Sequence, residues 1–146
     1  MEILNRKAKF DYFIAEEIEA GIVLTGTEIK SIRAGKCNIK DCYGIVKNGE
    51  VFLLNMYIAE YTEGNIFNHE ETRSRKLLLH KKEIKKITES IEKQGLTLVP
   101  LKGYFKDNKF KILLGICRGK KNYDKRETIK ERDIKRDVLK NIKEYK

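Results

Sequence analysis

The alternation of apolar and polar positions in the first part of the chain is mainly that of β-strands. In residues 10–24, Phe10, Tyr12 and Ile14 alternate with polar neighbours, two glutamates and a glycine then interrupt, and an apolar run follows. Alternation with a period of two is typical of half-buried strands, so this segment predicts two short antiparallel strands. Residues 1–9 precede any regular period and carry three basic side chains, which predicts a basic arm that lies against the domain.

Two segments have the spacing of helices instead. In residues 25–35, two isoleucines lie three positions apart, Thr27 can cap the first turn, and Gly35 can end the helix in a left-handed conformation. In residues 80–95, three isoleucines share one helical face, and Gly95 follows as a stop signal. We therefore expect a short first helix and a longer amphipathic second helix that packs on the sheet or barrel.

Turn residues divide the remaining strands into hairpins. Asn48-Gly49 lies between two β-rich runs in residues 41–58, and this pair readily adopts the positive φ angles of a type I′ turn. A Lys-Asp-Asn turn joins the last two strands in residues 96–118, and Pro100 in the first of them indicates an edge position or a bulge. Residues 62–75 are polar and have neither period, which predicts a surface loop.

Together these elements predict a mainly β domain over residues 1–118, with short flanking helices, and a basic tail over residues 119–146. In the tail the apolar content falls to single, spaced residues, and so charged a segment cannot offset the entropy of ordering by itself. We therefore expect the tail to be disordered when free. Its apolar residues recur at helical spacing, which predicts a helix that forms against a partner; they are Ile134, Val138, Ile142 and Tyr145.

The charge of the chain indicates a polyanionic partner. The formal net charge is +10 over 146 residues, and the isoelectric point is near 9.4. Residues 1–118 contain 21 basic and 16 acidic residues, and residues 119–146 contain 11 and 6, so each part carries +5. Nucleic acid fits such charge best, and an anionic membrane surface is the second possibility.

The cysteines, the N-terminus and the apolar runs exclude several classes of protein. Cys37, Cys42 and Cys117 form an odd number without a CxxC pair, which argues against a disulfide framework or a structural zinc site and predicts reduced packing residues. The N-terminus lacks an apolar stretch of signal-peptide length, and no apolar run approaches the ~20 residues of a membrane span. We expect a soluble, cytoplasmic monomer without metal or cofactor.

Two segments invite comparison with catalytic motifs, and both fail. Residues 115–121 follow a strand, but their glycine spacing is one residue short of a P-loop, and Lys121 stands where a magnesium-binding Ser or Thr is required. A basic loop that grips RNA phosphates fits this segment better. His69, Glu70 and Glu71 are adjacent in the predicted loop, so they cannot easily converge on one ion or substrate. We expect a surface loop there and no enzyme.

Acidic and basic groups on the predicted domain leave two interpretations open. The acidic residues Glu16, Glu17 and Glu19 can form the solvated edge of a strand, or Glu19 can accept hydrogen bonds from a base edge. A basic group runs from the loop into the second helix and is either a solvated face or, with nearby aromatic side chains, an RNA surface. The basic group is Arg73, Arg75, Lys76, Lys81, Lys82, Lys85 and Lys86, and the aromatic residues are Tyr57, Tyr61, Phe67, Tyr104 and Phe105.

Several ordered motifs are similar to those of one family, nearly from end to end. They are Asn5-Arg6-Lys7-Ala8, Glu19-Ala20-Gly21-Ile22, TGTEIKSIRAGK at 25–36, Gly64-Asn65, Phe67-Asn68-His69-Glu70, RKLLL at 75–79, Gly119-Lys120-Lys121 and Tyr123-Asp124-Lys125-Arg126. In these motifs the chain resembles the transfer-messenger-RNA-binding family of small protein B (SmpB), the SsrA-binding proteins. Several long motifs in the right order make a chance match improbable.

This resemblance implies a closed antiparallel barrel of the oligonucleotide-binding (OB) type and a structural role in trans-translation, in which transfer-messenger RNA and the protein enter a stalled ribosome. The RNA-facing residues that it implies on the domain are Asn5, Arg6, Lys7, Glu19, Leu78, Lys111, Gly119, Lys120 and Lys121. It also implies that the tail enters the decoding centre and the empty mRNA channel. The implied contacts with small-subunit ribosomal RNA are Tyr123, Asp124, Lys125 and Arg126, with Ile134, Val138 and Ile142 on the ordered face of the helix.

The chain departs from the family pattern at four positions outside these implied contacts. Glu71 and Ser74 stand where relatives usually carry prolines, Cys42 where many have Ser, and Gly44 where many have Ala. An alternative function on the same barrel is a general structured-RNA chaperone with a nonspecific basic tail. Its binding would weaken steeply and uniformly with added salt.

Overall fold

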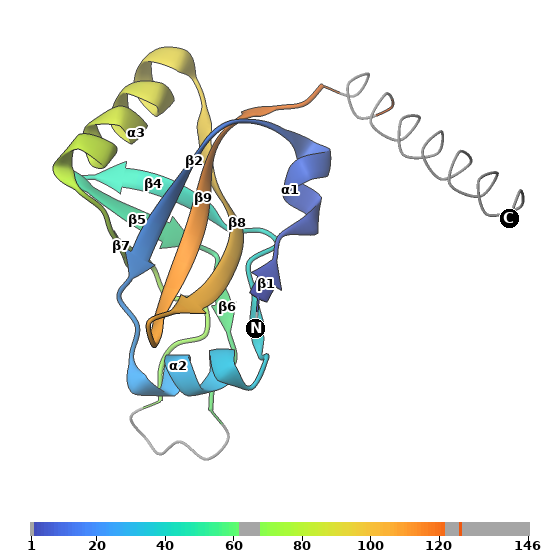
Figure 1. Cartoon of the computed structure of the whole chain (residues 1–146), viewed down its shortest axis with the longest axis vertical. Coiled ribbons are helices and arrows are strands. Elements are labelled where there is room, and N and C mark those ends of the chain that lie inside the picture. Colours follow the sequence, from blue (N-terminus) through green and yellow to red (C-terminus); the bar gives the residue numbers. More distant parts are fainter. Residues whose placement is uncertain (1, 62–67, 122–125, 127–146) are drawn as a thin grey trace, which may run out of the picture.

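The computed structural model describes residues 2–61, 68–121 and 126. These residues contain nine strands and three helices (Figure 1). In chain order the elements are β1 (Glu2–Leu4), α1 (Arg6–Asp11), β2 (Tyr12–Ile22), α2 (Gly26–Arg33), β3 (Cys37–Asn38), β4 (Tyr43–Lys47), β5 (Glu50–Leu54), β6 (Tyr57–Ile58), β7 (Arg75–Leu78), α3 (Lys81–Gln94), β8 (Thr97–Lys106) and β9 (Lys109–Gly119).

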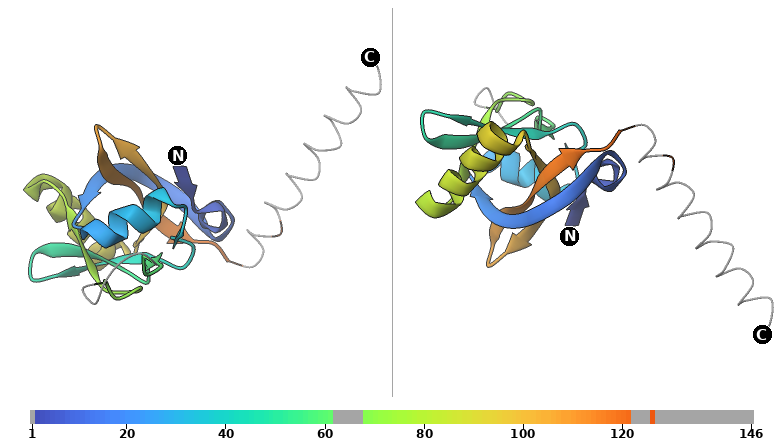
Figure 2. Two further views of the ribbon diagram at one scale, coloured as in Figure 1. Left: turned by 90° about the horizontal axis from the view of Figure 1, so that it is seen from below. Right: turned by 90° about the horizontal axis from the view of Figure 1, so that it is seen from above.

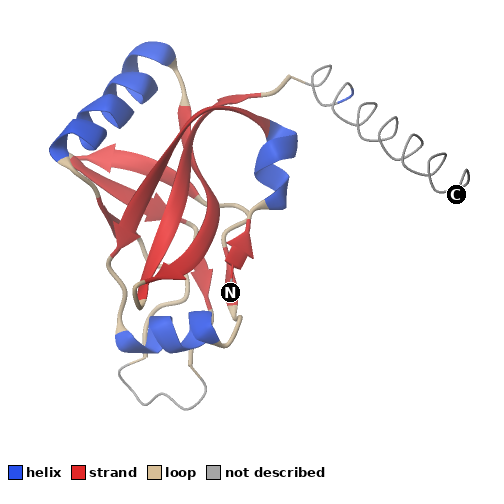
Figure 3. Ribbon diagram, viewed as in Figure 1, coloured by secondary structure: helices blue, strands red, loops and turns tan. Residues whose placement is uncertain are grey.

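Six of the strands are paired in a closed, antiparallel cycle. The strands are drawn in red in Figure 3. From β8 the pairings continue through β4, β5, β7, β2 and β9, and β9 pairs back with β8. β1 also pairs with β8, and β3 and β6 form a separate two-stranded sheet. The predicted mainly β fold class with a few helices is confirmed.

Apolar side chains from the cycle, from β6 and from two helices form most of the main core. α3 lies at the top of the described domain and α2 at its bottom (Figure 1), so α2 is in front when the domain is seen from below and α3 when it is seen from above (Figure 2). Each helix contributes a wholly buried isoleucine, Ile32 of α2 and Ile87 of α3. The wholly buried strand residues of this core are Leu53, Ile58, Leu98, Ile112 and Leu114.

The first predicted strand pair is wrong, because β2 is one continuous strand of 11 residues. It pairs with β9 along nearly its whole length, with a bulge between Ile14 and Glu16. The acids do not interrupt it: Glu17 is exposed on the outer side, and Glu16 forms an ion pair with Lys86 of α3. A long-range partner strand therefore overrides the local signal for an interruption.

The predicted basic arm is also regular structure, namely β1 and α1. Asn5, between them, donates its backbone N–H to the Leu101 carbonyl (2.9 Å) and its side-chain Nδ2–H to the Pro100 carbonyl (2.8 Å). Ala8 packs α1 against the domain with 2% of its surface exposed, and Phe10 belongs to α1 rather than to a strand. So short a helix is marginal alone and depends on such tertiary contacts.

Both predicted hairpin turns are confirmed, and so is the bulge near Pro100. Asn48 and Gly49 have φ values of 53° and 74°, and Asp107 and Asn108 have 52° and 63°. Two consecutive positive φ angles are the signature of a type I′ turn. The register between β8 and β9 shifts directly after Pro100, where a proline can be tolerated without a ladder hydrogen bond.

The two predicted helices are confirmed, but the first begins at a different cap. Thr25 caps α2 rather than Thr27: its N–H donates to Glu28 Oε1 (2.8 Å), and the Glu28 N–H donates to Thr25 Oγ1 (3.3 Å). This reciprocal pair is a capping box. Gly35 follows α2 with a φ of 76°, and Gly95 ends α3 with a φ of 65°.

The three cysteines are free thiols, as predicted. Cys42 and Cys117 are buried and Cys37 is half-buried, and burial raises the pKa of Cys37 and Cys42 to about 12. These two are therefore protonated packing residues at neutral pH. Within the described part of the chain, no helix has the length and apolarity to cross a membrane, and no three metal-ligating side chains gather.

Candidate RNA interface

Three of the residues expected to face RNA meet in one hollow. Glu19 of β2, Leu78 of β7 and Lys111 of β9 line a cavity of about 370 Å³, which we name the Glu19 groove. Strand register brings them together, because Gly21 of β2 pairs with Leu78 on one side and with Lys111 on the other. The remaining lining residues are Gly21, Leu79, His80 and Glu83.

Neighbouring side chains hold Glu19 as an oriented anion. The Tyr104 hydroxyl donates a hydrogen bond to Glu19 Oε2, and Lys106 Nζ lies 3.5 Å from Oε1. The bond from Tyr104, together with the charges of Lys106 and Lys111, holds the pKa of Glu19 below its usual range. Burial and the same hydrogen bond raise the pKa of Tyr104 to about 12. At neutral pH, Glu19 is thus a fixed carboxylate that can accept N–H or O–H groups of a base or ribose.

A second basic set lies where β9 ends against α1. Gly119 is the last residue of β9. The N–H of Lys120 donates to the Asp11 carbonyl (2.8 Å), and its Nζ donates to the Lys9 carbonyl (3.0 Å). These bonds hold the strand end beside the exposed basic residues of α1. The α1 patch, as we name it, comprises Arg6, Lys7 and Gly119–Lys121.

An aromatic ring that the sequence did not point to supports this patch. Phe13 of β2 is 39% exposed; the guanidinium carbon of Arg118 lies 4.5 Å from its ring centroid, and Lys120 Nζ lies 4.8 Å away. Cations over a ring face are attracted by its quadrupole. Only the pairing of Phe13 with Arg118 across β2 and β9 brings these residues together, so no local signal could have identified them.

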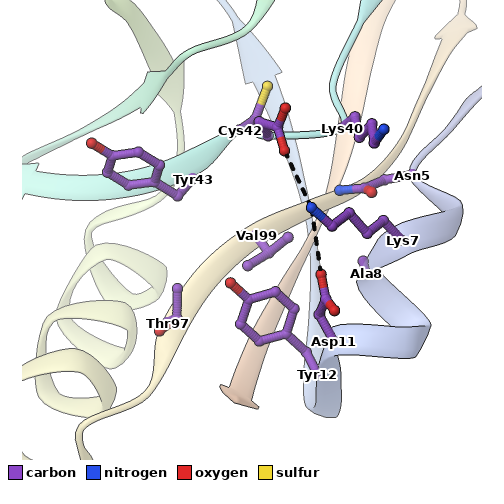
Figure 4. A pocket seen from close by; sticks show the side chains of 11 residues that line it. Asn5, Lys7, Ala8, Asp11, Tyr12, Lys40, Cys42, Tyr43, Thr97 and Val99 are labelled. Atoms are coloured by element: carbon purple, nitrogen blue, oxygen red, sulfur yellow. Dashed lines mark ion pairs between the residues drawn. The ribbon is translucent and has the colours of Figure 1, made fainter. Parts of the chain in front are cut away.

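A cavity of about 400 Å³ adjoins the α1 patch (Figure 4). The Lys7 side chain extends across it, with Nζ 3.6 Å from Asp41 Oδ1 and 4.0 Å from Asp11 Oδ2. Asn5, in the wall, is 6% exposed. The three N-terminal residues expected to face RNA therefore divide: Arg6 and Lys7 are at the surface, and Asn5 lies beneath it and positions α1.

The Glu19 groove and the α1 patch lie at opposite ends of the β2–β9 ladder. Tyr12 pairs with Gly119 at one end, and Gly21 pairs with Lys111 at the other. Nine residue steps of a strand at ~3.3 Å each separate the two ends by about 30 Å. The expected RNA-facing residues thus form two separate sites.

The basic group expected from the loop into the second helix does not form one surface. Arg75 is wholly buried, where it donates hydrogen bonds to Glu28 and to the Met56 carbonyl (2.6 Å). Lys76, next to it, lies 3.0 Å from Glu50 Oε1. Neighbours along a strand face opposite ways, which separates residues that are adjacent in sequence. The members exposed to solvent are Lys81, Lys82, Lys85 and Lys86 of α3.

The prediction of a surface position for His69 is wrong. His69 is 6% exposed; its Nε2–H donates to the Ile58 carbonyl (2.9 Å), and its Nδ1 lies 2.9 Å from the Thr27 hydroxyl of α2. Both ring nitrogens serve packing between segments, because α2 folds over this part of the loop. The candidate stacking residue Phe67 lies outside the described residues.

Most of the predicted tail lies outside the described residues as well. Of its expected ribosome contacts, Arg126 is described, and it is exposed. The predicted boundary at residue 118 and the predicted disorder of the tail stay predictions. The contacts outside the described residues are Tyr123, Asp124, Lys125, Ile134, Val138 and Ile142.

Comparison with known proteins gives consistent matches over nearly the whole chain. A family model described as "SmpB protein" matches residues 2–144. The SsrA-binding protein of Shouchella clausii is 59% identical over 140 residues, which are 96% of this chain and 90% of that protein. The SsrA-binding protein of Staphylococcus aureus is 60% identical over 139 residues, 95% of this chain and 90% of that protein.

A solved structure agrees with these relatives. It is described as "tmRNA-SmpB: a journey to the center of the bacterial ribosome". One of its chains superposes with a TM-score of 0.69 at 48% sequence identity, covering 83% of this chain and 85% of that one. At 48% identity the two chains are similar in amino-acid sequence as well as in fold.

Proposed function

This chain belongs to the SmpB family, and from that premise we propose that it binds transfer-messenger RNA and acts with it on ribosomes in trans-translation. One observation carries the proposal: relatives named SsrA-binding protein are 58–60% identical over at least 90% of their own length. SsrA RNA is the transfer-messenger RNA. The family is one of RNA-binding proteins, so the protein acts as a structural partner of the RNA and not as an enzyme.

The fold that carries this function is a closed barrel of the OB type. The cyclic pairing of six antiparallel strands supports this assignment, because closure leaves no long unpaired edge. β2, β7 and β9 then present their outer side chains on one wall of the barrel. Oligonucleotide-binding barrels use such a wall to receive RNA.

The Glu19 groove receives the tRNA-like part of transfer-messenger RNA. Leu78 is 53% exposed, and an apolar side chain so exposed can pack on a base or ribose face. Lys111 supplies a cation for a phosphate, and Glu19 accepts hydrogen bonds from groups that phosphates lack. Glu19 thus favours RNA that presents a hydrogen-bond donor at this position, while the lysines contribute affinity for the phosphates.

The α1 patch is a second contact surface for transfer-messenger RNA, and the tail contacts the ribosome. The patch lies about 30 Å from the groove along β2, so the RNA can contact the domain at two separate places. Gly119, Lys120 and Lys121 lead from the barrel into the tail. The tail enters the decoding centre and the empty mRNA channel, where Tyr123, Asp124, Lys125 and Arg126 contact ribosomal RNA and Ile134, Val138 and Ile142 order a helix.

Binding and tagging assays with separated surfaces test this proposal. The full-length protein should bind the tRNA-like domain of transfer-messenger RNA far more tightly than an elongator tRNA at 0.15 M salt. Deleting residues 123–146 should leave that affinity largely intact and abolish tagging of a nascent chain on a message without a stop codon. Equal affinity for the two RNAs would contradict the proposal and favour a general RNA chaperone. A loss of RNA affinity in the truncated protein would contradict the division into two surfaces.

A further inference from the structure

The charged residues of α3 are distributed unfavourably with respect to the helix dipole. The first six residues contain four lysines and one glutamate, and the last six contain two glutamates and one lysine. The N-terminal end of a helix carries the positive end of the macrodipole, so lysines there are unfavourable, and so are acids near the C-terminal end. Helix stability therefore does not explain this order of charges.

The lysine-rich half of α3 adjoins the Glu19 groove. His80 and Glu83, at the start of the helix, line the groove together with Glu19 and Leu78. Lys86 lies three residues after Glu83, on the same side of the helix, and forms an ion pair with Glu16 of β2. The helix start is thus fixed beside the outer side of β2, where the groove opens.

Three of the four lysines on this half have no such anchor. They are exposed, and within the described residues they form no ion pair with a carboxylate; they are Lys81, Lys82 and Lys85. The backbone N–H of His80, which precedes them, already donates to Glu83 Oε1 (2.9 Å). An anion near this helix end would therefore meet the ammonium groups.

We propose that Lys81, Lys82 and Lys85 bind the phosphate backbone of the same RNA that occupies the Glu19 groove. Lysine ammonium groups are mobile point charges that suit phosphates and carry no base specificity. The groove recognises groups of the RNA, and the lysines of α3 add phosphate contacts to the part of the RNA chain that lies outside the groove. This inference rests on the proposed function of the groove and extends the interface onto a second element.

Replacing the three lysines by glutamine tests the proposal, since glutamine matches lysine in helix propensity and removes only the charge. The matched control carries the same change of charge at three exposed lysines away from the groove, Lys36→Gln, Lys47→Gln and Lys93→Gln. The probe is the tRNA-like domain of transfer-messenger RNA, titrated with full-length protein from 0.05 to 0.3 M salt.

We expect the α3 variant to lose roughly 10- to 100-fold in affinity at 0.15 M salt, because each lost phosphate contact lowers the salt slope by about 0.7–0.9. Its slope should fall by about 2, and its thermal midpoint should stay or rise, since the helix dipole favours the change. The control should stay within about threefold of the wild type by the same relation.

Three outcomes would overturn the proposal or its premise. An α3 variant with wild-type affinity and slope would show that these lysines are a solvated face. Equal losses in the α3 variant and the control would show an effect of net charge alone. A wild-type protein that does not prefer the tRNA-like domain over an elongator tRNA would contradict the proposed function itself.

Discussion

Glu28 and Glu19 are two glutamates that both accept hydrogen bonds from neighbouring side chains but differ in burial. Glu28 of α2 is wholly buried and accepts hydrogen bonds from Arg73 and Arg75. Glu19 of β2 keeps 37% of its side chain exposed and accepts from a tyrosine and a lysine. Both have a pKa below the usual range.

The difference in burial assigns the two glutamates different roles. The Glu28 carboxylate lies inside the protein, so its interactions connect α2 to the loop and β7. The Glu19 carboxylate is oriented by its neighbours but still faces solvent, so it has acceptor capacity for a ligand. A lowered pKa alone therefore does not identify a functional acid; exposure decides.

The largest expected effect is the loss of stability on replacing Glu28 by glutamine. The change leaves the Arg75 guanidinium buried without its counter-ion, and breaking a buried pair in this way costs about 3–5 kcal/mol of the free energy of unfolding. Urea denaturation measures it. Glu50→Gln is the control, because its pair with Lys76 is about half exposed and should contribute roughly 0–1 kcal/mol. Equal losses in the two variants would contradict the structural role of Glu28.

Adjacent leucines of β7 should separate stability from RNA binding. Leu77 is 2% exposed and Leu78 is 53% exposed. Leu77→Ala should lower the free energy of unfolding by about 2–5 kcal/mol, measured by urea denaturation, whereas Leu78→Ala should change it by roughly 0.5 kcal/mol or less. In binding assays the order should reverse, with Leu78→Ala weakening the complex and folded Leu77→Ala retaining it. Similar losses of stability in the two variants would contradict an outward-facing Leu78 side chain.

Replacing Glu19 by glutamine should weaken RNA binding and leave stability nearly unchanged. The loss of a hydrogen bond to a charged acceptor should lower the affinity for the tRNA-like domain roughly 10- to 100-fold. Filter binding or fluorescence anisotropy measures it. Glu17→Gln, an exposed acid of the same strand outside the groove, should bind as well as the wild type or slightly better. If both variants bound more tightly, Glu19 would only repel the phosphates.

The smallest expected effect is a pH dependence of the free energy of unfolding, which appears in acid and is absent at neutral pH. Burial raises the pKa of Glu28, but hydrogen bonds from Arg73, the Thr25 N–H and Arg75 outweigh it and place the pKa below its ordinary value. A group whose folded pKa is depressed contributes stability above its unfolded pKa, about 4.3, and loses it as the pH falls through the folded pKa. Between pH 5 and 3, the free energy of unfolding of the wild type should therefore fall more steeply than that of Glu28→Gln. Parallel urea titrations at each pH measure this, and equal slopes would contradict the pairing.

Local signals were sufficient where a few adjacent residues decide the conformation. The Asn48-Gly49 turn, the Gly95 stop and the isoleucine face around Ile87 were all predictable, because positive φ angles and helical periodicity depend on neighbours in sequence. The extent of β2 and the helical structure of α1 were not predictable from neighbours in sequence. The 11-residue length of β2 depends on β9, and α1 depends on the hydrogen bonds of Asn5 to residues almost a hundred positions away.

The candidate site divides in the same way. Its residues were found through family motifs in the sequence, and the structure adds how they are arranged. Glu19, Leu78 and Lys111 share a groove, whereas Asn5 lies beneath the surface and Arg75 is locked to Glu28. Tyr104 was expected only as an aromatic that could stack on bases, and neither its bond to Glu19 nor the contact of Phe13 with Arg118 has a local signal, because the partners lie on other strands.

The sequence by itself determined the mainly β class, the turns, the basic charge and the family, since each depends on residue type and short-range order. Only the tertiary structure decided which charges are buried and which are presented. Strand pairing joins residues far apart along the chain, and burial changes the surroundings of a carboxylate or guanidinium far more than its sequence neighbours do. For that reason Glu28 and Arg75 stabilise the fold, while Glu19 and the lysines of α3 stay exposed, where we propose that they meet RNA.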